Sequence, residues 1–299
     1  MTQKRRRRRP QNKAEVAVEE ASREKEPRGR LGAKLPESPF PALGPTLGHG
    51  FRVVGSSPAI IAVALMALLP TWGAFVLLGD DAGPRTLSLL LSAPPVHVFS
   101  DAPVVLGPGT GGVYSALAVV GFAVLRAITF ALLTTLILQA LRDGKTSMRG
   151  ALRVLPRSTV VFGGLYLIEF GLVVAAFQLL VGFLGQLAIL SIAAGLYFLA
   201  FAPIVAAAEG AGPREALRRG FRAARLPGMR HLSLVLAYFL ILFYSGAIAP
   251  FGILTPATPS IGAWAYSLGW TFVHVSVLAA FAYRWLAVRE KVPSGPREA

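Results

Sequence analysis

Six long apolar stretches divide this chain, and each is close to the roughly 20 residues that a helix needs to cross the hydrocarbon core of a bilayer. In chain order they are Pro58–Leu78, Val113–Leu141, Thr159–Val181, Gly185–Ala208, Leu232–Leu254 and Ile261–Val288. With 54% hydrophobic and only 15% charged residues, the 299-residue chain has too much apolar surface for one water-soluble core. The sequence therefore predicts an all-α integral membrane protein with six transmembrane helices.

The distribution of positive charge predicts the orientation of these helices. Arg85 is the only basic residue in the segments 79–112, 182–184 and 255–260, whereas the loops 142–158 and 209–231 hold eleven Lys and Arg residues. Short cytoplasmic loops carry the excess of Lys and Arg in membrane proteins. We therefore expect both termini and the two basic loops to be cytoplasmic, in a multi-pass protein of a prokaryotic cell membrane.

Composition divides the chain into three regions. Residues 1–50 hold 12 Lys or Arg and 6 Glu with almost no aromatic residues, and are expected to form a disordered, basic cytoplasmic tail. Residues 51–290 form the six-helix transmembrane domain, and 291–299 a short cytoplasmic tail. The run Lys4–Arg9 favours anionic lipid headgroups over nucleic acid, because the same positive bias continues in the cytoplasmic loops.

The two cytoplasmic loops repeat one pattern. The second apolar stretch ends in Asp143-Gly144 and the fourth ends in Glu209-Gly210. In each case a helix-start signal follows, Ser147 as an N-cap in the first loop and Pro213 as a first-turn proline in the second. This match predicts a parallel repeat of two helical hairpins, flanked by the first and last helices.

Each loop is expected to form a short helix with an apolar face and an arginine face. The apolar faces consist of Met148, Leu152 and Leu155 in the first loop and of Leu217, Phe221 and Ala224 in the second. The arginine faces consist of Arg149, Arg153 and Arg157 and of Arg218, Arg222 and Arg225. Such helices lie in the membrane interface, so we expect Arg149, Arg153, Arg218, Arg222 and Arg225 to contact anionic headgroups.

The loop Glu209-Gly210 followed by Glu215–Gly220, with its fainter copy at Asp143–Leu152, resembles the repeated cytoplasmic loops of six-helix bacterial membrane proteins. These are the YciC-like proteins and the membrane domain of some glycerophosphoryl diester phosphodiesterases. The resemblance covers about residues 50–290 and implies the architecture alone, since the catalytic barrel of the phosphodiesterases has no counterpart here.

A second resemblance suggests an alternative function. The importer permeases of ATP-driven transporters carry a loop of Glu-Ala-Ala, then Gly, then a distant Leu-Pro, which docks the ATPase. Glu215-Ala216 precedes Gly220 at a similar interval, but position 217 is Leu and Leu226-Pro227 follows too soon. This resemblance implies a permease subunit or small transporter, with a protein partner at loops 142–158 and 209–231.

Three ionisable residues fall near the middle of apolar stretches. At 1.5 Å per residue, Arg126, Glu169 and His274 lie about 24, 18 and 15 Å above the inner boundary. Because charge at that depth is costly, Arg126 and Glu169 are expected to face the bundle interior and pair. The group is either a structural ion pair with a nearby histidine or a coupling centre for protons or substrate.

Other chemistry is not indicated by the sequence. The chain has no Cys, its four His lack metal-ligand spacing, and no nucleophile–base pair is visible. We therefore expect no catalytic site, metal or cofactor. The sequence predicts a non-catalytic component of the membrane that interacts with lipid, a protein partner or a transporter.

Overall fold

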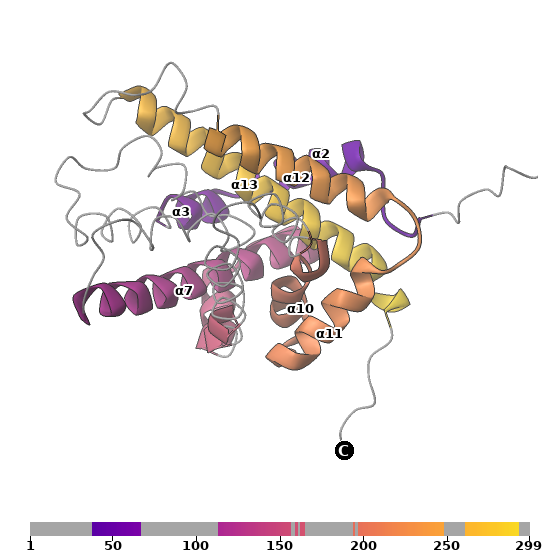
Figure 1. The fold of residues 1–299 in the computed structure, drawn as a ribbon, viewed down its shortest axis with the longest axis horizontal. Helices are drawn as coiled ribbons and strands as arrows, with labels where there is room; N and C mark the ends of the chain where they lie inside the picture. The colour runs from indigo at the N-terminus through magenta and orange to yellow at the C-terminus, as the bar shows by residue number, and fades with distance from the viewer. Residues whose placement is uncertain are drawn as a thin grey trace, which may run out of the picture. The chain divides into compact units, whose positions relative to one another are not determined.

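The computed structural model describes residues 38–66, 113–156, 159–160, 162–164, 194, 197–247 and 261–292. Side chains within 113–123, 125–126, 242–247 and 261–267 are not described. The described residues are helical and contain no strand (Figure 1), which confirms the all-α class for this part of the chain. The elements are α2 (Leu43–Gly55), α3 (Pro58–Met66), α7 (Val113–Asp143), α10 (Ala202–Glu209), α11 (Pro213–Ala224), α12 (Arg230–Ala247), α13 (Ile261–Val288) and the 3₁₀ turn η3 (Arg289–Lys291).

Three of the predicted apolar helices begin at or within two residues of the predicted positions. The last stretch is α13 with the same first and last residues, and the second is α7, which ends two residues later than expected. The fifth is α12, which begins two residues earlier, at Arg230. Most of the third stretch lies outside the described residues, as do the outer loop 79–112 and the segment 255–260.

The fourth apolar stretch is interrupted near its end. An apolar helix of Tyr197–Glu209 contains a turn at Ala200-Phe201, after which α10 begins with Pro203 in its first turn. Proline lacks an N–H and its ring clashes with the preceding turn, so a helix breaks just before it. The break makes α10 a short separate segment that leads to the loop 209–231.

The N-terminal end of the described chain differs from the sequence prediction. We expected a disordered tail up to residue 50, but α2 begins at Leu43 and Phe40 is completely buried. α2 then meets α3 at an angle of 85° across Ser56-Ser57. The bend has a local cause, because Pro58 disfavours a helical conformation at the residue before it. The prediction of disorder is therefore wrong for residues 38–50, and residues 1–37 lie outside the described chain.

α13 forms the centre of the packing and contacts α2, α3, α7 and α10. Its approach to α2 depends on small residues. A Cβ atom added at Gly50 of α2 would lie 2.3 Å from the backbone oxygen of Ser276 and 3.0 Å from the backbone nitrogen of Ala280. Small residues that let two helix backbones approach closely are typical of membrane helix pairs.

Within the described residues, one helix is long and apolar enough to cross a membrane. It comprises the 24 residues Leu268–Lys291, most of which are buried against other helices. The bent pair of α2 and α3 meets the same criteria only when its two parts are taken together.

Candidate membrane-interface site

The two matched loops begin with the same backbone conformation. Gly144 has φ +66° and Gly210 has φ +63°, both in the left-handed region. In each case the glycine directly follows the acidic residue that ends a helix, α7 at Asp143 and α10 at Glu209. A side chain would be strained in this conformation, so the repeated glycine terminates both helices for the same steric reason.

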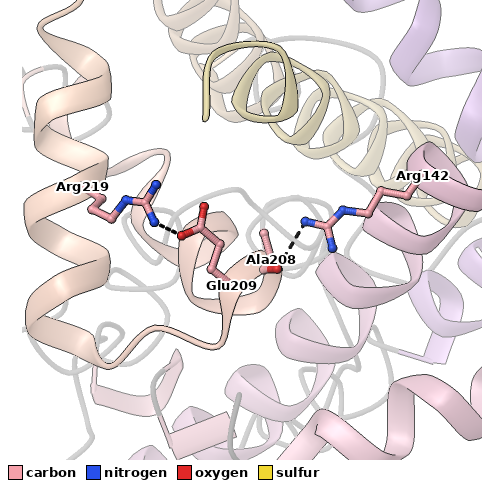
Figure 2. A network of polar contacts seen from close by, with 4 residues as sticks. All are labelled: Arg142, Ala208, Glu209 and Arg219. Carbon is pink, nitrogen blue, oxygen red and sulfur yellow. Dashed lines mark hydrogen bonds and ion pairs between the residues drawn. The ribbon is translucent and has the colours of Figure 1, made fainter. Parts of the chain in front are cut away.

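The ends of the two helices lie side by side. Figure 2 shows Arg142 and Arg219 directed at the C-terminal end of α10 from two other helices. Arg142 Nη2 donates a hydrogen bond to the Ala208 carbonyl at 3.2 Å, and Arg219 forms an ion pair with Glu209. Positive groups at a helix C-terminus also interact favourably with its dipole. The loops that the sequence paired by pattern are thus joined in space.

The two acidic residues of the repeat have different roles. Glu209 holds Arg219 of α11 and so fixes the loop helix against α10. Asp143 is exposed, and its charge favours the charged form of Arg142. Burial and the nearby Arg289 outweigh that effect and lower the pKa of Arg142 below its usual value.

The first loop helix, residues 148–156, packs Leu155 against the core but leaves Met148 and Leu152 of the same apolar face uncovered. The predicted N-cap is confirmed, because the Gly150 N–H donates to Ser147 Oγ at 3.1 Å. Ala151 is buried, whereas Met148 and Leu152 are 38% and 50% exposed. The neighbouring Arg149 and Arg153 are exposed as well. Apolar and cationic side chains therefore point away from the protein on the same short helix.

The second loop helix packs on the protein through its small residues. We expected Leu217, Phe221 and Ala224 to form an apolar face turned toward the membrane, and the stripe buried in the protein is Ala216, Gly220, Ala223 and Ala224. A Cβ atom at Gly220 would lie 2.9 Å from the Ala202 nitrogen, so the small residues seat α11 directly on α10. Phe221 is left 42% exposed, stacked on Phe198 at 4.8 Å.

The arginines of α11 remain at the surface. Arg218 and Arg225 are exposed and Arg222 is partly buried. Arg225 lies over the Phe221 ring at 5.6 Å, and Arg218 is 4.0 Å from Glu215. The exposed aromatic ring and the exposed guanidinium groups thus occupy one surface, which matches the arrangement in the first loop helix.

The predicted intramembrane group is described only in part. The Arg126 side chain and Glu169 lie outside the described residues, so their pairing stays a prediction. His274 of α13 is buried, with its ring centroid 5.7 Å from that of Tyr238 and 6.2 Å from that of Trp270. Its described surroundings are therefore aromatic.

The sequence did not identify two other buried polar residues, His231 and Arg284. His231 Nε2 lies 2.8 Å from the Tyr197 carbonyl oxygen, to which it donates, and its ring stacks near Phe40 and Phe201. In the sequence, both residues lie near the ends of apolar stretches, close to other basic residues. The charge asymmetry of membrane proteins is enough to explain basic residues at such positions, so the sequence did not single them out.

No metal-binding arrangement is present in the described part of the chain, where no three His, Asp or Glu residues gather. The features that the structure brings together are the paired helix ends, the two arginine-bearing loop helices and the buried Arg284.

Comparisons with known proteins give no relative: no protein-family model, no curated protein and no solved structure matches this chain.

Proposed function

We propose that this chain is a non-catalytic, multi-pass protein of the cytoplasmic membrane whose two loop helices bind anionic lipid at the inner surface. The observation that carries the proposal is the joint exposure of apolar and arginine side chains on these helices. It is supported by Met148, Leu152, Arg149 and Arg153 on the first helix and by Phe221 with its arginines on the second.

The energies favour an interface location for these helices. An apolar side chain such as Leu152 gains about 1.5–3 kcal/mol when fully removed from water, and half-exposed residues leave part of that gain unused. A basic residue near an anionic leaflet contributes about 1 kcal/mol. A helix in the interface gains both contributions at once, because its apolar side chains enter the hydrocarbon region while its guanidinium groups lie at the level of the headgroups.

The proposed topology has six spans with both termini inside. Its support is the length of α7 and α13, the window Leu268–Lys291 and the asymmetry of basic residues between the loops. The loop pattern of this chain resembles that of the YciC-like proteins and of the phosphodiesterase membrane domains. We propose that the architecture is related to theirs.

Cysteine labelling tests this topology, because the chain has no Cys of its own. Single Cys residues placed at Arg149 and Arg218 should react with a membrane-impermeant maleimide only after the cells are opened. A Cys in the segment 79–112 should react in intact cells. External labelling of Arg218→Cys would overturn the proposed orientation.

Lipid retention tests the interface helices. Replacing Arg149, Arg153, Arg218, Arg222 and Arg225 with Gln should remove about 1 kcal/mol per residue of headgroup attraction and lower the phosphatidylglycerol that co-purifies in mild detergent. The matched control replaces the same five residues with Lys, which keeps the charge and should keep most of the lipid. Equal lipid in the Gln and Lys variants would show that these arginines do not bind it.

A protein-docking role is the second candidate. It is favoured by the hydrogen bond from Arg142 to Ala208, which joins the ends of α7 and α10 from which loops 142–158 and 209–231 begin. In that case the chain is a permease subunit or a small transporter. The Gln variant would then lose a co-purifying protein while its lipid content stayed unchanged.

A further inference from the structure

Arg284 of α13 is a buried cation held by neutral groups. Its side chain is completely buried, and its Nη1 donates to the Arg230 carbonyl while its Nε donates to Thr46 Oγ1 at 3.4 Å. Nη2 is buried and has no hydrogen-bond partner among the residues that the structure describes. Within the described residues, no carboxylate lies within ion-pair distance of this guanidinium.

The surroundings of Arg284 add positive rather than negative charge. Arg230 is the first residue of α12, an 18-residue helix whose N-terminal end carries the positive end of the helix dipole. The first N–H groups of a helix have no partner within it, which makes such an end suited to anions. Two guanidinium groups and a helix N-terminus therefore meet without a described counter-charge.

The segment 38–42, which we call the strap, occupies one donor of this cluster. Arg230 Nη1 donates to the Phe40 carbonyl at 2.9 Å, and the Phe40 ring lies 6.0 Å from the Arg284 guanidinium. The same ring stacks on Phe201 at 5.8 Å and on His231 at 5.4 Å. A backbone carbonyl is a neutral acceptor, so the strap satisfies hydrogen bonds but leaves the charge uncompensated.

We propose that the N-terminal end of α12, with Arg230 and Arg284, is a binding site for a phosphate group that takes the place of the strap carbonyl. Guanidinium groups match phosphate oxygens in pairs, and the buried Nη2 of Arg284 supplies a donor that the strap does not use. The phosphate belongs either to a lipid headgroup or to a soluble molecule. The site uses none of the five loop arginines, so it stands or falls separately from the lipid-binding role proposed above.

The test measures thermal unfolding of the full chain in detergent as phosphate is added at constant ionic strength. One arm uses inorganic phosphate, another uses phosphatidylglycerol in mixed micelles, and phosphatidylcholine is the reference lipid. We expect a saturable rise in Tm with at least one of the first two. A response to inorganic phosphate identifies a soluble ligand as sufficient, whereas a response to phosphatidylglycerol alone identifies a lipid headgroup.

Arg230 and Arg214 are both exposed, and each lies in the first turn of its helix, so their substitutions form a matched pair of variants. Arg230→Gln should weaken the response at least tenfold, while Arg214→Gln, at the start of α11, should leave it unchanged. Arg284→Met should raise Tm without phosphate, because it removes a buried charge, and should abolish the response.

Three outcomes would overturn the proposal. They are the absence of any saturable response, an equal response in Arg230→Gln and Arg214→Gln, and a response that is lost in the five-arginine Gln variant but kept in Arg230→Gln. The last result would assign the phosphate to the loop helices. Loss of lipid from the loop variant with an intact phosphate response would leave both sites standing.

Discussion

Gly50→Ala is expected to destabilise the protein although alanine is the better helix former. The new Cβ would lie 2.3 Å from the Ser276 backbone oxygen, so α2 and α13 must separate or bend. Overpacking of a tight contact costs about 1–3 kcal/mol, and a clash with backbone is at the upper end because no side chain can rotate away. The loss should appear as a lower Tm in detergent, followed by helical circular dichroism.

Gly48→Ala is the matched control on the same helix. Nothing lies within 4 Å of a Cβ at this exposed position, so the change should stabilise α2 by about 0.5–1 kcal/mol through helix propensity alone. The two substitutions are therefore expected to have opposite signs. Stabilisation by both would show that α2 and α13 do not approach at Gly50.

Phe40→Ala is expected to have the largest effect on stability, about 3–5 kcal/mol, which is the usual cost of truncating a buried aromatic side chain. Phe40 is completely buried, and its ring is nearly parallel to that of Phe201, with 2° between the planes. Its removal leaves a cavity beside the Phe201 and His231 rings, both of which stack on Phe40. Tm in detergent again provides the measurement.

Phe51→Ala serves as the comparison for Phe40. Phe51 is 36% exposed and contacts Phe272 at 5.7 Å, so its truncation should cost much less. This comparison separates the structure from the sequence prediction, because a disordered segment containing Phe40 would lose nothing on truncation. Equal Tm values for Phe40→Ala and the wild type would show that residues 38–42 belong to the disordered tail expected from the sequence.

The sequence succeeded where a local pattern has one physical meaning. A long apolar run without Pro predicted α13 with its observed ends, and the glycines after Asp143 and Glu209 marked the ends of α7 and α10. Ser147 and Pro213 began their helices as expected. Each of these features depends on residues within a few positions of one another.

The sequence did not show which face of α11 packs on the protein, because its amphipathic pattern marked only the large apolar residues, which were expected to face the membrane. The structure buries Ala216, Gly220 and Ala223 against α10. Periodicity ranks faces by hydrophobicity, whereas close helix contacts select small side chains that let backbones approach. The exposed Phe221 therefore became visible only once the partner helix was in place.

The sequence by itself determined the helical class, the positions of the described apolar helices and the matched loop starts, because hydrophobic run length and glycine geometry act locally. The tertiary structure decided which residues meet over long separations. Arg142 reaches Ala208 across 66 positions, and Arg230 reaches Phe40 across 190. Such contacts depend on how the helices pack, and no local pattern in the chain encodes them; for that reason the strap and the buried Arg284 were found only in the folded protein.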